Sequence, residues 1–596
     1  MHFSQRKRQQ TETSFRVTIT SPHFILFLIC VLLLTTSIAA FLQLSEVNYL
    51  SLHTNILMGL TDSMLILSPY LMLKPRFRRS ILFPMIILPI ILYANLLYIR
   101  NFGDLMSFTM MTGAQNATNM IWSGIAASMR WHDLWIGIPF LLTFPAWRFF
   151  RGVVSGAKFP LKFKFISVAF CLLAFIAQQI FLYRVFHLDF DNRVQVDPAV
   201  TSEKFHYRKL KYMERYLNLR YYGLIPYLSL ETYKYLKPKY HKLNEDEMQA
   251  ISSFYAQPLP PAIISAPANN RQKNLILIIV ESLNSSVLTA EVDGKPALPY
   301  LDSIIKNPSI ILATKMIPQV GIGRSSDAQF MYQTGLLPLK NEALAMIYPS
   351  ADYPSIAKAL KRAGVELNPG PPSQWNHIPM ATSYGNLFRG GSELRDIPDN
   401  SLDAYIFNRA LDEIPAKKPF LEIICSVDSH DPYLKYDGII TDASKDQSYL
   451  ETERIYIEKL RQFDRALESF ISNLKERNLY NNSVIVIASD HTARESTLSG
   501  SKTLNTGYIP LIILNSGVSL RTDAKIGQID VFPTILDIMG VLKSYEWKGI
   551  GTSLLRNPAA SRKAAQPVEI ENPFTYPSED AWKLSESMVT GGYFRE

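Results

Sequence analysis

The sequence predicts a two-part fold, a multi-pass α-helical membrane domain followed by an extracytoplasmic α/β domain with a mainly parallel central sheet. Long apolar segments crowd the first 190 residues, and short β-branched runs alternate with amphipathic helical patterns after residue 272. The length of 596 residues exceeds one ordinary domain, and 47% hydrophobic against 19% charged residues is apolar for a soluble protein. Both observations favour a membrane part joined to a globular one.

Five segments are long and apolar enough to cross a bilayer, which takes ~20 helical residues. The first is also open to interpretation as a cleaved signal peptide, but no small-residue cleavage site follows it. Asp62 lies within the second segment, where a carboxylate serves either a functional site or helix packing. We therefore expect residues 1–190 to form a membrane domain with five transmembrane helices, at 24–44, 55–73, 81–99, 132–150 and 165–184.

Basic residues in the short loops predict the orientation, because cytoplasmic loops are enriched in Lys and Arg. Thirteen lie before the first segment or after the second and fourth, whereas the alternate loops carry only Arg100 and Arg130. This pattern places the N-terminus in the cytoplasm and everything beyond about residue 185 outside the cytoplasmic (inner) membrane. The thirteen are Arg6, Lys7, Arg8, Arg16, Lys74, Arg76, Arg78, Arg79, Arg148, Arg151, Lys158, Lys162 and Lys164.

The charge and the cysteines exclude two other classes. The net charge of +9 comes from basic residues beside apolar runs, with no continuous basic stripe, so we expect no nucleic-acid partner. Cys30, Cys171 and Cys425 show no CxxC spacing, which argues against a disulfide framework or a thiolate metal site.

The outer half divides by composition. Residues 191–271 suit juxtamembrane helices and a proline-rich linker, residues 272–555 a compact domain, and residues 556–596 a loosely ordered tail. Strands that are apolar on both faces and alternate with amphipathic helices indicate a mainly parallel sheet covered on both sides. The expected strands are 274–280, 309–317, 420–427, 483–489 and 509–515.

Three of these strands run into acidic or histidine residues. Glu281 follows the first, Asp428 and His430 follow the third, and Asp490 and His491 follow the fourth. Each alone is commonly the start of a loop, but ligands gather beyond the carboxyl ends of parallel strands. Carboxylates with imidazole suit Mn²⁺ or Zn²⁺ better than Mg²⁺ alone.

The segment GIGRSSDAQF supplies a candidate nucleophile beside that cluster. Ser325 and Ser326 are good N-cap residues, and Ser326 with Gln329 matches a capping box. A serine at a helix N-terminus meets N–H groups that hold an oxyanion, and Arg324 can balance added charge. The alternative is that this stretch is only a helix cap.

At these residues the chain resembles the alkaline phosphatase/sulfatase superfamily, most closely its lipoteichoic acid synthase branch of membrane phosphoglycerol transferases. The resemblance covers about residues 20–555 and includes both halves. The matching motifs are VES at 280–282, GRSSD at 323–327, SVDSH at 426–430, SDH at 489–491, QIDVFPTILDIMG at 528–540 and GIGTSLL at 549–555.

The resemblance implies an enzyme with one divalent metal ion, Mn²⁺ first and Zn²⁺ or Mg²⁺ as alternatives. It places the metal ligands on Glu281, Asp490, His491 and Ser325, with Ser325 also the nucleophile, and a substrate-binding histidine on His430.

Three departures from the family pattern concern the substrate. Ser325 stands where the family has threonine, which keeps the hydroxyl. Trp375 is retained, but Asn368 stands in place of a histidine and His377 in place of an arginine. The lost guanidinium changes how a phosphate would be held. Trp375, His377 and Arg324 remain expected substrate-binding residues.

The resemblance implies transfer of a phosphorus-containing, phosphoglycerol-like headgroup from a membrane lipid to an envelope glycan or lipid, through a phospho-Ser325 intermediate. One alternative is a sulfatase or phosphodiesterase, although Ser325 lacks a Cys/Ser-x-Pro-x-Arg context. A second is a phosphoethanolamine transferase, although such enzymes usually carry several external disulfides. A third is a binding or sensing protein without turnover.

Overall fold

The protein divides into two compact units, residues 1–112 with 121–237, and residues 113–120 with 238–596. The computed structural model describes residues 22–45, 51–74, 77, 80–102, 105–108, 128–150, 159–194, 215, 219, 223–236, 239–340, 342–367, 380, 383–385, 402–415, 419–431, 433, 449–493, 504, 507–557 and 578–595.

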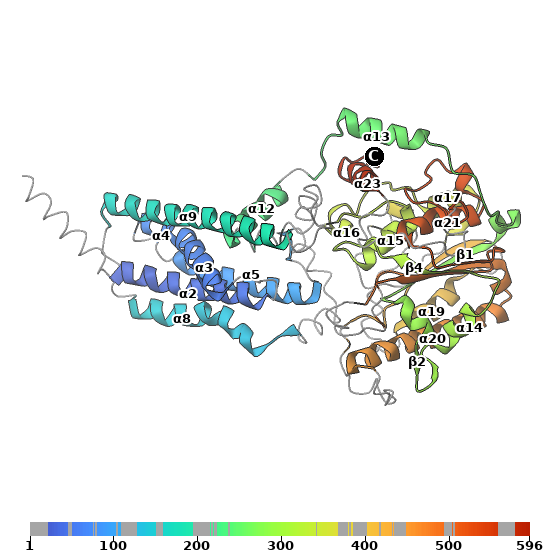
Figure 1. Cartoon of the computed structure of the whole chain (residues 1–596), viewed down its shortest axis with the longest axis horizontal. Helices are drawn as coiled ribbons and strands as arrows, with labels where there is room; N and C mark the ends of the chain where they lie inside the picture. The colour runs from blue at the N-terminus through green and yellow to red at the C-terminus, as the bar shows by residue number, and fades with distance from the viewer. Residues whose placement is uncertain are drawn as a thin grey trace, which may run out of the picture. The chain divides into compact units, whose positions relative to one another are not determined.

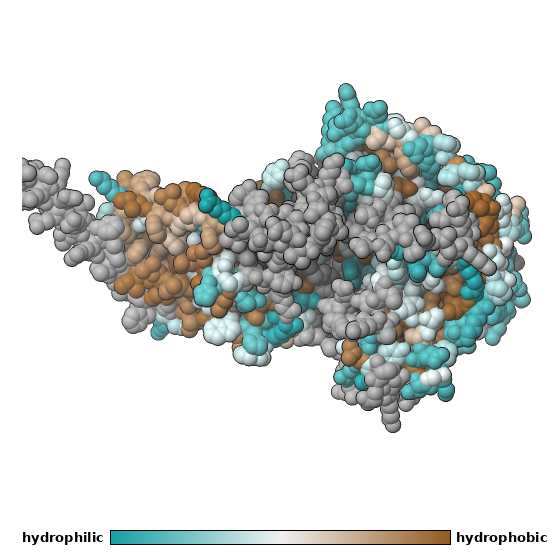
Figure 2. Space-filling view, viewed as in Figure 1, coloured by the Kyte–Doolittle hydropathy of each residue, from teal (hydrophilic) through white to brown (hydrophobic). Residues whose placement is uncertain are grey.

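The first unit is built of apolar helices (Figure 1). Each expected apolar segment lies on a helix, but the second is interrupted at Ser68, because Pro69 begins a new helical turn there. Among the described residues, three helices are long and apolar enough to cross a membrane, Phe24–Leu44, Leu82–Arg100 and Leu161–Leu182. Hydrophobic residues gather over this unit in Figure 2. Its helices are α2 (Pro22–Leu44), α3 (Leu52–Leu67), α4 (Pro69–Met72), α5 (Leu82–Phe102), α8 (Leu134–Phe150), α9 (Leu161–Val194) and α12 (Leu224–Leu236).

Asp62 has a structural partner within this unit. Its buried carboxylate accepts a hydrogen bond of 2.9 Å from the backbone N–H of Leu224, the first residue of α12. Gly223 precedes it with φ +92°, and a Cβ there would lie 2.9 Å from Asp62 Oδ2. Of the two interpretations of this carboxylate, the contact supports helix packing, because it satisfies a helix N-terminal donor.

The second unit is a mixed, mainly parallel sheet, as predicted. Its strands follow the order β10-β4-β8-β7-β1-β6-β5, and β9 also pairs with β4. Among the described strands of this sheet, β8 alone runs antiparallel to its neighbours, β4 and β7. The strands are β1 (Asn274–Val280), β4 (Ile311–Ile317), β5 (Glu366–Leu367), β6 (Phe420–Cys425), β7 (Ser483–Ser489), β8 (Ile509–Leu514), β9 (Leu520–Thr522) and β10 (Ile526–Gly527).

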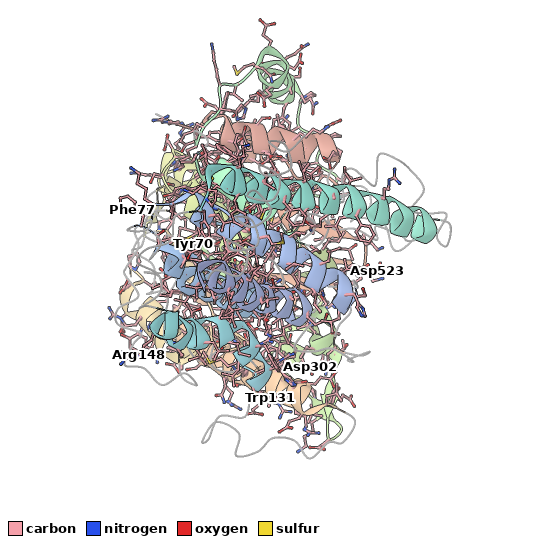
Figure 3. The ribbon with its side chains drawn as sticks, turned by 90° about the vertical axis from the view of Figure 1, so that its left-hand side faces the viewer. Tyr70, Phe77, Trp131, Arg148, Asp302 and Asp523 are labelled. Atoms are coloured by element: carbon pink, nitrogen blue, oxygen red, sulfur yellow. The ribbon has the colours of Figure 1, made fainter. Side chains whose placement is uncertain are left out.

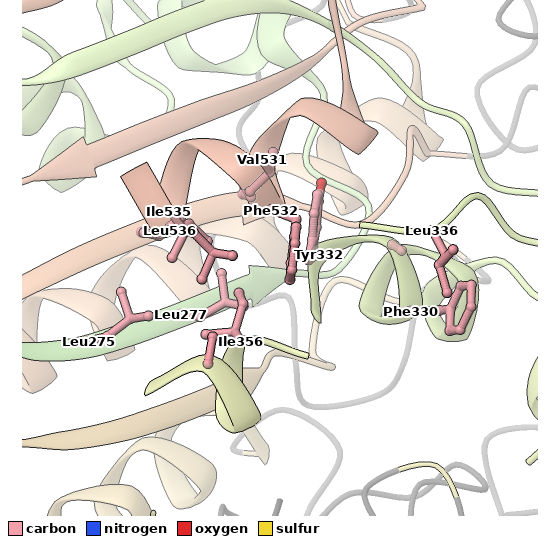
Figure 4. Packing of buried hydrophobic residues seen from close by; sticks show 14 of the residues in the cluster. Leu275, Leu277, Phe330, Tyr332, Leu336, Ile356, Val531, Phe532, Ile535 and Leu536 are labelled. Carbon is pink, nitrogen blue, oxygen red and sulfur yellow. The ribbon is translucent and has the colours of Figure 1, made fainter. Parts of the chain in front are cut away.

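Both faces of this sheet are buried. Successive side chains of a strand point to opposite faces, so Leu275 and Leu277 enter one core cluster while Ile276 and Ile278 enter another. The first cluster includes residues of α15 (Ser325–Thr334), α17 (Ile356–Arg362) and α21 (Val531–Ile538), and Figure 4 shows part of this packing. The second includes residues of α14 (Pro299–Ile305), α19 (Leu402–Glu413) and α20 (Glu451–Glu476). This three-layer arrangement fixes the carboxyl ends of the strands.

The C-terminal segment differs from the expected loose tail. Residues Glu579–Thr590 form helix α23, which packs against α13 (Glu245–Ala256). Trp582 and Met588 are buried, and Ser585 Oγ donates a hydrogen bond of 2.8 Å to the Leu337 carbonyl. The helix is amphipathic, so its apolar stripe finds a partner in the core.

Candidate functional site

Glu281, Asp490 and His491 converge at one sheet edge. Glu281 directly follows β1 and Asp490 follows β7, and these two strands are parallel neighbours. One ligand atom from each of the three residues lies within 4.8 Å of the others, and all three residues are buried. Two carboxylates and an imidazole in this geometry suit a divalent cation.

Ser325 brings a hydroxyl to this cluster from the start of α15. Its Oγ lies 3.2 Å from Glu281 Oε2 and 3.2 Å from His491 Nε2. The nucleophile predicted from sequence therefore contacts two of the predicted metal ligands, although the chain separates it from them by 44 and 166 residues.

The orientation of His491 leaves Nε2 available. Its Nδ1 lies 2.9 Å from the carbonyl oxygen of Thr492. A carbonyl only accepts hydrogen bonds, so in this contact the proton is on Nδ1. In a neutral ring the lone pair is then on Nε2, the nitrogen that faces Ser325, Glu281 and Asp490.

The carboxylates repel each other inside the protein. Burial and the charge of Glu281 raise the pKa of Asp490 well above its usual value. For Glu281, burial is outweighed by the charges of His491 and His430 and by hydrogen bonds with Ser282 and Asp490, so its pKa falls to about 2. A bound cation would relieve this repulsion.

Two family models match the two parts of the chain. Residues 273–541 match the sulfatase family, and residues 5–242 match the lipoteichoic acid synthase N-terminal domain. The chain belongs to the alkaline phosphatase/sulfatase superfamily.

Curated relatives are similar to the chain in both of its parts. The chain is 25% identical over 499 residues to lipoteichoic acid synthase of Staphylococcus saprophyticus, covering 79% of this chain and 73% of that protein. It is 24% identical over 556 residues to lipoteichoic acid synthase 1 of Bacillus subtilis, and the match covers 85% of this chain and 82% of that protein. The protein is therefore an enzyme of this superfamily.

A solved structure shares the fold. The integral membrane lipooligosaccharide phosphoethanolamine transferase A of Neisseria meningitidis aligns with a TM-score of 0.51 and 13% identity, over 86% of this chain and 95% of that one.

Serines near the ends of the strands hold Glu281 in place. Ser426 Oγ accepts a hydrogen bond of 2.8 Å from the Glu281 N–H, and Ser429 Oγ donates one of 2.6 Å to the Glu281 carbonyl. Ser282 has φ +54°, and its Oγ and N–H donate to Glu281 Oε1 and Asp490 Oδ1 at 2.7 and 2.8 Å. These bonds support a backbone conformation that is costly for a non-glycine residue.

The loop before Ser325 is organised by Asp327. This fully buried carboxylate accepts a 2.9 Å hydrogen bond from the Gly321 N–H, and a Cβ on Gly323 would lie only 2.2 Å from its Oδ1. Burial raises the pKa of Asp327 to about 8. Backbone hydrogen bonds with Gly321 and Gly323 and the charge of Arg324 lower this pKa, but burial has the larger effect. Asp327 therefore fixes the glycine-rich loop, a role that its place in the GRSSD motif did not reveal.

The predicted serine cap is wrong in detail. The N-cap of α15 is Arg324, with φ +48°, and Ser325 is already the first helical residue. Ser326 Oγ donates to the Gly323 carbonyl at 2.7 Å and forms no capping box. The left-handed backbone at Arg324 turns the chain so that Ser325 faces the cluster.

Two glutamines connect this loop to the predicted metal-ligand loop, which holds Asp490 and His491. Gln528 Oε1 accepts a 2.6 Å hydrogen bond from the Gln319 N–H, and Gln319 Oε1 accepts one of 3.0 Å from the Ile529 N–H. Gln528 Nε2 donates to the Asp490 carbonyl at 2.6 Å. No local sequence signal marks this pair, because its members are more than two hundred residues apart.

The other residues predicted from the sequence to belong to the site have different contacts or lie outside the described residues. Asp428 accepts hydrogen bonds from the N–H groups of Leu402 and Asp403 at 3.2 and 3.0 Å, so it holds the start of α19. His430 is partly exposed, and its charge lowers the pKa of Glu281. Trp375, His377 and Asn368 lie outside the described residues.

Proposed function

We propose that the protein transfers a phosphorus-containing, phosphoglycerol-like headgroup from a membrane lipid to a cell-envelope glycan or lipid, through a covalent phospho-Ser325 intermediate. The observation that carries this proposal is the position of Ser325 Oγ, 3.2 Å from both Glu281 Oε2 and His491 Nε2. A hydroxyl at a helix N-terminus between two proton acceptors suits a nucleophile attacking an anionic ester.

In the first step, Ser325 Oγ attacks phosphorus, the Oγ–P bond forms, and the bond from phosphorus to the lipid oxygen breaks. The serine proton passes to a neighbouring acceptor, and the lipid alkoxide gains a proton as it leaves as an alcohol. In the second step, an acceptor hydroxyl attacks phosphorus and loses its proton, the acceptor O–P bond forms, the Oγ–P bond breaks, and Ser325 Oγ regains a proton.

The donor set fits a metal ion held by Glu281, Asp490, His491 and Ser325. When bound, a divalent cation, Mn²⁺ first with Zn²⁺ or Mg²⁺ as alternatives, would favour the serine alkoxide and offset phosphoryl charge. Two buried carboxylates that repel each other support such a site.

We assign substrate binding to His430, Arg324, Trp375 and His377. His430 is partly exposed beside Glu281, as a residue that meets an incoming substrate must be. Arg324 directly precedes the nucleophile and carries a permanent charge.

We infer that the catalytic domain, residues 272–555, lies outside the inner membrane. The basic-residue pattern supports this orientation. Trp131, in the short 3-10 turn before α8, and Trp135, in the first turn of α8, are 72% and 53% exposed, as expected for aromatic anchors at the opposite interface from Arg148. Figure 3 shows Trp131 and Arg148 near opposite ends of α8.

The test is mass spectrometry of the full-length chain after incubation with vesicles containing phosphatidylglycerol and, separately, phosphatidylethanolamine. We expect a phosphoglycerol adduct on Ser325. The Ser326→Ala variant is the matched control, because it removes the adjacent hydroxyl and keeps Ser325.

Each outcome decides between the alternatives. A phosphoethanolamine adduct would replace the proposed donor with that of the second transferase class. Release of free headgroup phosphate without transfer to any added acceptor would indicate a hydrolase. Lack of both adduct and turnover with added Mn²⁺ would contradict an enzymatic role for Ser325.

A further inference from the structure

We propose that the second unit carries a separate binding site for an anionic carbohydrate, a sugar unit bearing a carboxylate or phosphate. The site is an open hollow of about 650 Å³, a volume within the range of ligand pockets. Its lining includes Tyr255, Trp547, Tyr593, Lys361 and Arg362. None of these residues belongs to the proposed catalytic machinery.

The walls of the hollow are aromatic. Trp547 is buried, and its ring centroid lies 5.8 Å from that of Tyr255 and 6.1 Å from that of Phe594. Tyr255 and Tyr593, whose centroids are 6.3 Å apart, are each 37% exposed. A rigid buried ring behind two partly exposed tyrosines offers flat apolar faces with hydroxyl groups at their edges, which suit the C–H faces and hydroxyls of a sugar.

The charge at this hollow comes from the last turn of α17. Lys361 and Arg362 are both exposed, and the Arg362 guanidinium lies 5.4 Å from the centre of the Tyr545 ring. Within the part of the chain that the structure describes, neither forms an ion pair. These two cations are therefore available to an anion.

The other charged residues at the hollow do not cancel this pair. Lys358 is occupied, because its Nζ lies 2.5 Å from Asp352 Oδ1 and also donates to the Tyr353 and Ser383 carbonyls. Asp352 and Lys358 therefore compensate each other. Glu546 is left as the one acidic lining residue against Lys361 and Arg362, which favours an anion over a neutral sugar.

Topology separates this hollow from the metal-ligand cluster. Helix α17 returns the chain to the amino end of β5, and α21 returns it from the carboxyl end of β10 to residues 545–547. The hollow thus runs along α17 to the amino-terminal edge of the sheet, whereas Glu281 and Asp490 follow the carboxyl ends of β1 and β7. A strand of seven residues spans ~23 Å, so one ligand unit does not reach both sites.

The test is isothermal titration calorimetry on the full-length chain in detergent. The probes are a tetrasaccharide of alternating glucuronate and N-acetylglucosamine, glucose 6-phosphate, neutral chitotetraose and inorganic phosphate. We expect one of the two anionic sugars to bind at least about tenfold more tightly than chitotetraose and inorganic phosphate, because each lacks one of the two recognised features. The anionic sugar that binds identifies the carboxylate or the phosphate as the preferred group.

Variants locate the binding. The double variant Lys361→Gln/Arg362→Gln should weaken it about tenfold, and Tyr593→Ala should weaken it by a similar factor. Lys295→Gln, an exposed lysine on the β2–β3 hairpin (Glu291–Pro296) beside the other core cluster, should leave it unchanged. Turnover at Ser325 should stay at the wild-type level in all three.

The proposal is overturned if neither anionic sugar binds, or if chitotetraose or inorganic phosphate binds as tightly. It is also overturned if the double variant binds like the wild type. Loss of binding in Ser325→Ala, with the double variant unaffected, would assign the ligand to the catalytic site instead.

Discussion

The side-chain amide of Gln528 donates a hydrogen bond of 2.6 Å to the backbone carbonyl of Asp490. The same amide group lies 3.0 Å from the Tyr332 hydroxyl, and all three residues are buried. Tyr332 in turn donates to the Ser489 carbonyl. One glutamine therefore holds the proposed metal-ligand loop against the helix that carries Ser325.

We expect Gln528→Glu to lower both turnover and stability. The substitution keeps the shape but places a carboxylate oxygen against the Asp490 carbonyl, so a donor is lost in a buried position, at a cost of about 1–3 kcal/mol. Turnover and urea unfolding measure the two effects. Gln272→Glu, at an exposed position, is the control, and equal behaviour of the two variants would contradict a positioning role.

Ser325→Ala should reduce turnover by at least roughly a thousandfold, because it removes the attacking oxygen. Its stability should change by less than about 0.5 kcal/mol. Ser326→Ala should show the reverse pattern, with turnover retained and about 1 kcal/mol of stability lost with the hydrogen bond to Gly323. Steady-state kinetics with thermal unfolding measure both, and retained turnover in Ser325→Ala would remove this serine from the mechanism.

Removal of divalent ions by a chelator should abolish turnover and lower the unfolding temperature. Mn²⁺ at a hundred times its dissociation constant should restore about 2.7 kcal/mol of stability by mass action. In Asp490→Asn the metal content and this stabilisation should both fall. The matched control is Asp464→Asn, because Asp464 is a buried carboxylate that accepts hydrogen bonds from the Tyr300 and Leu301 N–H groups. Equal metal content in the two variants would exclude Asp490 as a ligand.

The C-terminal helix should contribute to stability. Met588 is fully buried in the core, so Met588→Ala should cost about 2–5 kcal/mol through lost burial and a cavity. Lys583→Ala, on the exposed face of α23, should cost less than about 0.5 kcal/mol. Chemical denaturation of the full-length chain distinguishes them, and similar values would mean that α23 does not stabilise the domain.

Much of the architecture could be predicted because it depends on patterns of consecutive residues. Apolar length marks the helices of the first unit, and β-branched runs mark β1, β6, β7 and β8. The strand ends mark Glu281, Asp490 and His491, because the residue after a parallel strand must lie at the ligand edge of the sheet. The parallel pairing of β1 with β7 brings the three together.

Other features left no readable local pattern. The serine cap was predicted wrongly because composition does not show that Arg324 adopts a left-handed backbone. The tail was expected to be loosely ordered, but its residues Glu579–Thr590 form α23, which packs against α13 and the core.

The sequence by itself determined the two-part architecture and the identity of the groups at the strand ends, since hydrophobic periodicity and strand termination are properties of consecutive residues. Only the tertiary structure decided how those groups are held. Asp327, Gln319, Gln528, Ser426 and Ser429 act through hydrogen bonds to backbone atoms of a loop or strand end. Most of these bonds join residues far apart in the chain, and such bonds depend on where the fold brings the backbone, which no short stretch of sequence specifies.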